Sequence, residues 1–454
     1  MSEPVTKATQ AMNIYNYTVQ ELEASGKLAK GQLPVGTPDN IHSISNAFSN
    51  PAFDPNIFVS GLLNVIALRR VASKMYENPW SIAIRRKTRP GEVIQEIYYK
   101  MAEPYEFDLS KTVERENKLT LPEVLTAFHY INYRKQYPIS VSRELMAFAF
   151  FTWEDVGDAI MNVINTMYTA ANYDLYQALK YMIAMEVKRG RIKTIQTNDL
   201  VSGNAQNVAQ DVIAVTGEMT ELSPDFNFAG VPNFSTPDEQ YIIGTHEFFA
   251  WNAVKVLATA FNMSETKFLQ TKKLVTNAFS KIDVARLDKL FAEDPGYTSL
   301  SQDDLNSLDN IVAVIVDRDF FQCYQDIFEV TENYVGSGMA RNYWLNVHYH
   351  LGVSPFENAV AFVTEPVAVS SVTVTPSALT ITQGQSGKVS AVVKGTGFPD
   401  SRVTWSVNTN ADKITIEPDG TISVASDCPT GAKTITATSV ADKNKKGTAT
   451  LTVN

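Results

Sequence analysis

The chain of 454 residues is poor in the residues that build disulfide and metal sites, with two cysteines and five histidines. Cys323 and Cys428 lie in different presumed domains, which excludes a disulfide scaffold and a cysteine-based zinc site. The longest aliphatic run, near Ile311–Val316, is far too short to span a bilayer. Residues 1–7 lack the apolar core of a signal peptide. We therefore expect a soluble protein that is made in a cytoplasm and has no membrane partner.

Charge is unevenly distributed along the chain, whose net charge is −10. Residues 370–454 hold eight basic and six acidic side chains, whereas the rest holds 31 basic and 43 acidic ones. An acidic body does not seek nucleic acid. The lining of a container that must not grip packaged DNA would also be acidic, but so are many ordinary soluble proteins. Length and the apolar fraction of 44% allow two or three hydrophobic cores.

Motifs that could carry chemistry are weak in this sequence. His348 and His350 lie two apart on a probable strand, but no third metal ligand follows at a usable spacing, so a structural role is favoured. Asp317 and Asp319 flank an arginine, and a salt-bridged strand end explains them better than a catalytic pair. The segment Gly384–Lys388 is two residues too short for a phosphate loop. We predict no catalytic residues, no metal site and no cofactor.

The clearest regular element is a helix over Trp153–Arg189. Apolar residues recur there at helical spacing, and a basic last turn precedes Gly190. At this length the helix would measure about 55 Å, enough to run across a whole domain. The Asn-, Gln- and Gly-rich segment 201–235 predicts long loops instead. Two apolar runs, 311–316 and 358–363, predict buried strands.

The segment Arg85–Lys118 differs from its surroundings because 15 of its 34 residues are charged. Unpaired buried charge is costly, so no core can hold this density. Strand-like alternation precedes and follows the most charged part: one set of side chains is Val93, Gln95, Ile97 and Tyr99, and another runs over 133–141. This pattern indicates a long hairpin. The residues alone favour an ordinary surface hairpin with a solvated tip.

The last 85 residues predict a small β-sandwich. Runs such as 372–376, 403–407 and 448–453 alternate apolar and hydroxyl residues, as strands with one buried face do. Val403, Trp405 and Val407 share one face, so we place this tryptophan in the core. The order V-x-V-x-P, a glycine, V-T-W-S and D-G-T-I-S-V resembles the bacterial Ig-like group 2 module. Such modules display or bind and carry no chemistry.

Several patches of the body carry a second resemblance through their order along the chain. They are Pro90–Tyr98, Phe128–Tyr130, Ile160–Tyr168, Leu257–Met263, Val316–Phe321 and Val353–Val363. Together with the Ig-like end, this order resembles the major capsid proteins of tailed bacteriophages, in particular the major head proteins of small short-tailed phages that infect Gram-positive bacteria.

The resemblance implies an α+β fold, the tailed-phage major capsid fold, followed by an all-β Ig-like sandwich. Its expected divisions are an N-terminal arm (1–54), a capsid shell domain (55–369) and the Ig-like domain (370–454) on the outside of the shell. Within the shell domain it implies an extended arm at about 82–141, a spine helix at about 153–189 and an axial domain at about 190–310.

The same resemblance implies a structural, non-enzymatic function. Copies of the chain would form pentamers and hexamers of an icosahedral head, assembled in the host bacterial cytoplasm, that encloses double-stranded DNA without sequence-specific binding. Further partners would be a portal protein and, because residues 1–54 are short for a built-in scaffolding segment, a separate scaffolding protein. The predicted inter-subunit contacts of the extended arm are Arg85, Arg86, Lys87, Arg89, Glu92 and Glu96.

One alternative function stays open at this point: a bacterial adhesin or carbohydrate-binding protein that carries an Ig-like module. The absence of a recognisable signal peptide and wall anchor argues against it. Mass in solution separates the two hypotheses, because an adhesin stays small.

Overall fold

The fold is seen in a computed structural model, which describes residues 7–49, 57–58, 76–89, 91–102, 104, 106–107, 121–142, 153–200, 204–251, 272–338 and 340–454. The chain divides into two compact units. Unit 1 consists of Met1–Val93, Tyr130–Gln177 and Cys323–Leu351, and unit 2 of Ile94–His129, Ala178–Gln322 and Gly352–Asn454. Most of the charged tip of the predicted arm, residues 108–120, lies outside the described residues.

Unit 1 is built on a four-stranded sheet with the order β1-β9-β10-β4. The strands are β1 (Ile84–Lys87), β4 (Ile131–Ser142), β9 (Cys323–Val335) and β10 (Ala340–His350). Strand β10 is antiparallel to both of its neighbours, and β1 runs parallel to β9. Tyr133 and Tyr137 of β4 are buried, while the residues between them are exposed or half-buried. The strand predicted over 133–141 is confirmed, and the face that carries Tyr133 and Tyr137 is its buried one.

A long helix packs on the sheet of unit 1. Helix α6 (Trp153–Lys188) ends one residue earlier than the helix predicted from the sequence. The ring of Tyr168 lies 5.8 Å from that of Phe328 on β9, and Tyr137 donates a hydrogen bond of 2.8 Å to Asp174 of the helix. Burial, Tyr133 and Asp174 together raise the pKa of Tyr137, so this hydroxyl stays protonated as the donor.

The N-terminal part of unit 1 is helical. Its described elements are α1 (Lys7–Ala24), α2 (Ile41–Ser49) and the short 3-10 helix η1 (Ser81–Ala83). Tyr15 is fully buried: its hydroxyl donates to the carbonyl of Pro34 at 2.9 Å, and its ring contacts Phe58 at 5.2 Å. The apolar spacing of Pro55–Arg70 also predicts a helix, and this segment lies outside the described residues except for positions 57 and 58.

Unit 2 contains a five-stranded sheet with the order β5-β11-β8-β6-β7. Its strands are β5 (Lys193–Gln196), β6 (Gln240–Thr245), β7 (Lys272–Thr276), β8 (Ile311–Asp317) and β11 (Ala359–Val363). Every residue of β8 and β11 is buried. These are the two buried strands that the apolar runs predict.

The prediction of loops throughout 201–235 is wrong, because helix α7 (Ala205–Glu218) occupies part of this segment. Val208, Val212 and Val215 are spaced along one side of the helix and pack with strands β6, β8 and β11. Polar residues such as Gln210, Asp211 and Thr216 are interspersed with these valines in the sequence and hide the apolar stripe in the overall composition. Two shorter helices, α10 (Val284–Leu290) and α11 (Gln302–Leu308), complete this region, and a capping box of Ser301 and Asp304 begins α11.

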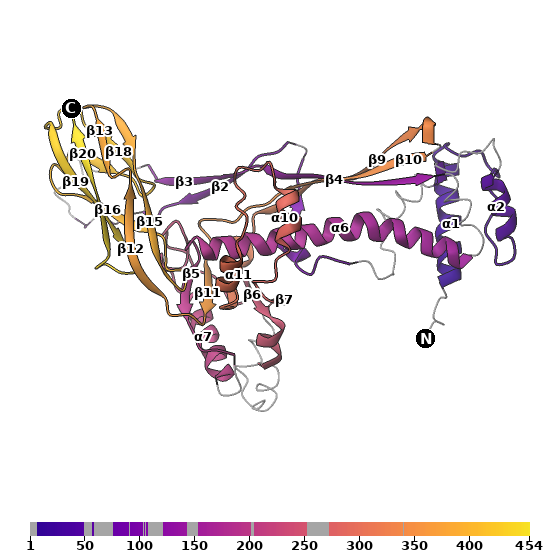
Figure 1. The fold of residues 1–454 in the computed structure, drawn as a ribbon, viewed down its shortest axis with the longest axis horizontal. Coiled ribbons are helices and arrows are strands. Elements are labelled where there is room, and N and C mark those ends of the chain that lie inside the picture. Colours follow the sequence, from indigo (N-terminus) through magenta and orange to yellow (C-terminus); the bar gives the residue numbers. More distant parts are fainter. Residues whose placement is uncertain are drawn as a thin grey trace. The chain divides into compact units, whose positions relative to one another are not determined.

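An antiparallel hairpin also belongs to unit 2. It consists of β2 (Ile94–Tyr99) and β3 (Val124–His129), paired along their full length (Figure 1).

Residues 368–454 form an all-β region of unit 2. Its strands are β12 (Ala368–Thr375), β13 (Ala378–Ile381), β14 (Ser386–Lys388), β15 (Ser390–Thr396), β16 (Val403–Val407), β17 (Ile414–Ile416), β18 (Thr421–Val424), β19 (Gly431–Ser439) and β20 (Lys446–Val453). They make three small sheets, β12-β15, β13-β20-β19-β16 and β14-β18-β17. One hydrophobic cluster lies between them, which includes Ile422, Ile435 and Leu451.

The loop between β15 and β16 joins the all-β region to the rest of unit 2. Arg402 donates from Nη1 to the carbonyls of Pro224 (3.3 Å) and Asn227 (3.1 Å), while Asp400 holds its guanidinium at 2.6 Å. Ser401 donates from its backbone N–H to the carbonyl of Gly190, just beyond the end of α6, at 2.9 Å. Gly190 has φ +64°, and a Cβ atom there would meet the carbonyl oxygen of Pro399 at 2.3 Å. Only glycine fits this approach.

Candidate assembly surface

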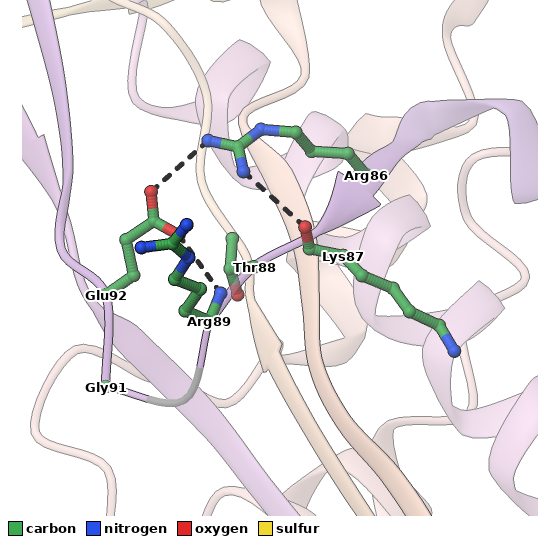
Figure 2. A pocket seen from close by; sticks show the side chains of 6 residues that line it. All are labelled: Arg86, Lys87, Thr88, Arg89, Gly91 and Glu92. Carbon is green, nitrogen blue, oxygen red and sulfur yellow. Dashed lines mark hydrogen bonds and ion pairs between the residues drawn. The ribbon is translucent and has the colours of Figure 1, made fainter.

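The basic residues predicted as arm contacts lie at the end of β1 in unit 1. Arg86, Lys87 and Arg89 are exposed, and together with Thr88, Gly91 and Glu92 they line a hollow of about 660 Å³ (Figure 2). Parallel pairing with β9 holds this strand, and the backbone N–H of Thr88 donates to the carbonyl of Gln325 at 2.8 Å. The sheet thus fixes the backbone while the cationic side chains reach outward.

Glu92 partly neutralises this basic hollow. Its carboxylate accepts from the backbone N–H of Arg89 at 3.0 Å and pairs with the guanidinium of Arg86 at 3.3 Å. The Arg89 N–H, with a smaller contribution from Arg86, lowers the pKa of Glu92, so this carboxyl is ionised at neutral pH. Three cationic side chains and one carboxylate line the hollow, and Figure 2 shows the side chain of Lys87 directed away from Glu92. The hollow therefore presents net positive charge to an approaching partner.

Arg85 is tied to the sheet of its own unit. Its guanidinium donates to the Tyr324 hydroxyl at 3.1 Å and lies 6.0 Å from the centre of that ring. Arg86 approaches the same ring, at 5.7 Å. These cation–π contacts fix the first two basic residues more firmly than the two that follow.

Glu96 lies in unit 2, in the hairpin, and its carboxylate has internal partners. Ser354 donates to Oε1 at 2.5 Å, and His129 lies 3.2 Å from Oε2. The side chain is only 16% exposed. Glu96 is therefore largely buried and has partners within its own unit, whereas the cations of β1 are exposed, although the sequence groups them together.

The hairpin has two unlike faces. Leu125, Ala127 and His129 alternate with exposed residues on β3, and Ile94, Glu96 and Tyr98 do the same on β2. The other face carries four large apolar side chains that are 42–61% exposed, namely Ile97, Tyr99, Val124 and Phe128. Sequence alternation places Gln95, Ile97 and Tyr99 on one side, which is confirmed, but it does not show that this is the side left to water. Such an apolar surface indicates a site of protein contact.

Residues considered for chemistry have structural partners. His350 is buried, and its Nε2 lies 2.9 Å from the carbonyl oxygen of Glu92, while His348 lies 3.9 Å from Asp326. Asp317 accepts the backbone N–H of Asp319 at 2.8 Å, at the start of a 3-10 turn. Across the described ranges, no three histidine, cysteine, aspartate or glutamate side chains come together in a way that could hold a metal ion.

In the all-β region, Val403, Trp405 and Val407 are half-buried and pack against the edge of the hydrophobic cluster. The indole of Trp405 donates to the carbonyl of Pro418 at 3.4 Å. Its ring also lies near Gly420, where φ is +82° and an added Cβ would clash with the backbone of Val389. The three side chains share one face, as the sequence predicts, but Trp405 is half-buried beside the cluster and is not one of its buried core residues.

Comparison with known proteins shows the family to which this chain belongs. A family model described as the Phi29-like phage major capsid protein matches residues 16–363. The chain belongs to this family. The prediction of a phage major capsid protein is therefore confirmed, and the protein is a structural component of a virion; the adhesin alternative is not favoured.

Individual relatives agree with membership of the Phi29-like family. The major capsid protein of Bacillus phage PZA is 25% identical over 407 residues, covering 88% of this chain and 85% of the relative. That of Bacillus phage B103 is 26% identical over 415 residues, covering 90% and 86%. Among solved structures, the capsid structure of Staphylococcus phage Andhra aligns with a TM-score of 0.49 at 13% identity, covering 66% of this chain and 88% of the other.

The mixture of helices and sheets agrees with the predicted α+β class. Among the described residues, no helix combines the length and the apolar character needed to cross a membrane.

Proposed function

We propose that this chain assembles with copies of itself into pentamers and hexamers of an icosahedral phage head that encloses double-stranded DNA. Membership of the Phi29-like major capsid protein family supports this proposal. The observation that carries it is the apolar outer face of the β2–β3 hairpin, which leaves Ile97, Tyr99, Val124 and Phe128 exposed.

A hairpin of two strands has little stability of its own, and four large apolar side chains in water add none. Burying them against a second copy removes that surface from water, at a gain of about 25 cal/mol per Å². In a closed shell each copy makes such a contact with several neighbours. Modest contacts then sum to a strong cage, because each later contact forms within an assembly already held together.

The basic segment, by which we mean Arg85–Arg89, orients the neighbouring copy in these contacts. We propose that Arg86, Lys87 and Arg89 meet acidic side chains of a neighbouring copy, with Arg85 held in place by Tyr324 and Glu92 tempering the local charge. The chain outside the all-β region has an excess of acidic residues, so a copy of this chain is a complementary partner. Charge complementarity of this kind chiefly selects orientation and speeds encounter.

The remaining parts of the proposal concern the domains and partners. Residues 370–454 form an Ig-like module on the outside of the shell, supported by an alternating strand pattern and a core of their own. Residues 55–369 form the shell domain, with the arm at about 82–141 and the axial domain at about 190–310. A separate scaffolding protein and a portal protein complete the assembly in the host cytoplasm, and the DNA is enclosed without sequence-specific contacts.

Co-expression of the full chain with the scaffolding and portal proteins of its phage tests the proposal. We expect closed shells of uniform size in negative-stain micrographs and a fast-sedimenting peak. If the chain stays monomeric or forms only irregular aggregates with these partners present, the proposed assembly function is wrong.

A further inference from the structure

The inner face of the β2–β3 hairpin is held to the rest of unit 2 by a small set of polar contacts. At their centre is Glu96, whose two carboxylate oxygens face different partners. Ser354 donates to one oxygen at 2.5 Å, and the imidazole Nε2 of His129 lies 3.2 Å from the other. His129 comes from the opposite strand of the same hairpin, whereas Ser354 comes from the segment that precedes β11. The carboxylate thus joins both strands of the hairpin to the body of the unit.

Ser354 is itself fixed, so its contact with Glu96 has a defined direction. It is buried, and its oxygen accepts the backbone N–H groups of Phe356 at 3.1 Å and Glu357 at 3.2 Å. Its own backbone N–H donates to the carbonyl of Phe320 at 2.8 Å. A hydroxyl that accepts two N–H groups must direct its hydrogen elsewhere, and Glu96 is the acceptor it meets.

Two further contacts support this junction from the next residues along. The hydroxyl of Tyr98 donates to the carbonyl of Pro232 at 2.6 Å, and its ring stacks on Phe356 with centroids 5.7 Å apart. On the other strand, His129 approaches Gly352 so closely that a Cβ atom there would lie 2.8 Å from Nδ1. The inner face of the hairpin is therefore in direct contact with one particular surface of unit 2, through hydrogen bonds, ring stacking and close packing.

We infer that Glu96 is a positioning residue: by joining Ser354 and His129, it fixes the direction in which the hairpin leaves unit 2. It does so before any second copy is present, because all of these partners belong to the same chain. The inference assigns Glu96 an internal role in place of the inter-subunit contact expected from the sequence.

The consequence for assembly rests on the proposed function. If the apolar outer face of the hairpin is the contact surface, its direction in the free subunit decides whether it meets a neighbour correctly. A hairpin held at one angle enters the contact with less loss of conformational freedom than a swinging one. Removal of the Glu96 contacts would leave the apolar outer face of the hairpin chemically unchanged, but the direction of that face would no longer be fixed.

Hydrogen exchange on the unassembled full chain tests the positioning itself. In Glu96→Ala, backbone amides of 94–99 and 124–129 should exchange about tenfold faster than in the wild type, because a two-stranded hairpin without its support opens readily. Gln95→Ala is the matched control, since this neighbour points to the exposed face, and its exchange should match the wild type. Unchanged exchange in Glu96→Ala, or an equal rise in Gln95→Ala, would overturn the inference.

Two gentler variants keep the test decisive if Glu96→Ala does not fold. Glu96→Gln keeps an oxygen for Ser354 and an amide that can donate to neutral His129, so it should retain most of the protection. Tyr98→Phe loses only the hydroxyl contact with Pro232, and it should show a smaller rise in exchange confined to the hairpin. Wild-type exchange in Tyr98→Phe would count against the inference. So would a loss of protection in Glu96→Gln as large as that in Glu96→Ala.

Shell formation by the same variants separates this inference from the proposed function. If the wild-type chain forms closed shells, the Glu96→Ala variant should form few of them and the Glu96→Gln variant should form many. Normal shells from a Glu96→Ala protein whose hairpin exchanges fast would show that hairpin direction is irrelevant to assembly. The consequence for assembly would then be wrong, while the positioning role of Glu96 and the proposed function would both stand. Absence of shells from the wild type would contradict the proposed function, and the exchange result would still decide the positioning role.

Discussion

The basic segment of β1 and the outer face of the β2–β3 hairpin follow one another along the chain, yet they offer a partner opposite chemistry. Arg86, Lys87 and Arg89 surround a hollow with one carboxylate. A few residues later, Ile97 and Tyr99 are exposed on the same face as Val124 and Phe128 of β3, and this face carries no charged side chain among the described hairpin residues. One surface depends on charge, and the other depends on the removal of apolar area from water.

This difference separates two tasks in association. Apolar burial supplies most of the free energy and is not weakened by the screening of charges in salt. Exposed charges contribute little free energy each, but they orient the partner and respond strongly to ionic strength. We therefore expect changes on the hairpin face to abolish contact, and changes in the basic segment to alter its rate and salt dependence.

The strongest expected effect comes from making the hairpin face polar. Ile97→Asp combined with Tyr99→Asp should weaken each subunit contact by more than about 3 kcal/mol, because two large apolar burials are lost and two charges need water. That corresponds to a hundredfold or greater loss in the contact equilibrium constant. Sedimentation should show soluble, unassembled protein, and its melting temperature should equal that of the wild-type subunit because both side chains are already exposed.

A matched double variant on the basic strand β1 provides the control for this result. Arg86→Ser with Lys87→Ser changes the same number of exposed residues and should leave many shells intact. If the hairpin variant assembles as well as this control, the outer face of the hairpin is not a contact surface and the comparison is wrong.

The next largest effect is expected from the half-buried carboxyl of Glu357, which shows how partial burial changes the behaviour of a charge. Glu357 accepts a hydrogen bond from Asn233 at 3.1 Å, and burial, with the nearby charge of Asp317, raises its pKa to about 7. Between its usual pKa of 4.5 and this value, the folded chain holds a proton that the unfolded chain has lost. The free energy of unfolding should therefore fall as pH rises through this window, by on the order of 3 kcal/mol.

Denaturant unfolding of the unassembled subunit from pH 4 to 8 measures how steeply the free energy of unfolding changes with pH, which is the slope to be compared between variants. Glu357→Gln should remove most of it, because an amide does not titrate, and should be more stable than the wild type at pH 8. Glu218→Gln, on the exposed side of α7, is the control and should keep the wild-type slope. Equal slopes in the wild type and Glu357→Gln would show that Glu357 is ionised throughout.

The smallest effect is expected from the basic segment. Reversing Arg86, Lys87 and Arg89 to glutamate should slow shell formation severalfold in dilute buffer, since an attractive surface becomes repulsive. At about 1 M salt, where the Debye length is about 3 Å, the difference from the wild type should nearly vanish. Light scattering during assembly at several salt concentrations measures both rates. A salt-independent defect, or a lower melting temperature of the subunit, would assign these residues to folding instead.

Elements with a strong local pattern could be predicted from the sequence. Helix α6 has apolar residues at helical spacing over its whole length and a glycine after its basic last turn, so the sequence predicts its end to within one residue. The buried strands β8 and β11 are short runs of purely apolar residues. In α7 the apolar stripe is narrow and set among Asn, Gln and Gly, so the composition of this segment predicts loops although its apolar spacing is helical.

The contact residues could be predicted only in part, because burial is decided by partners far away in the chain. Alternation places Ile97 and Tyr99 on one side of a strand, but which side faces the body depends on Ser354 and Phe356, some 250 residues later. Glu96 looks like one more charge in a charged run, and its Ser354 partner is 258 residues distant. By contrast, Arg86 and Glu92 are near neighbours in the chain, and their pairing is local.

The fit of Arg402 and Ser401 against Asn227 and Gly190 has a consequence for anything that touches the all-β region. A domain on a loose tether points in many directions, whereas this one is pinned to the end of a long helix and to a loop beside it. Every copy in a shell would then present the same patch at the same angle and at regular intervals. A ligand that binds one patch weakly, if it is itself repetitive, would be held by many at once, so the avidity of the particle would come from the rigidity of this joint.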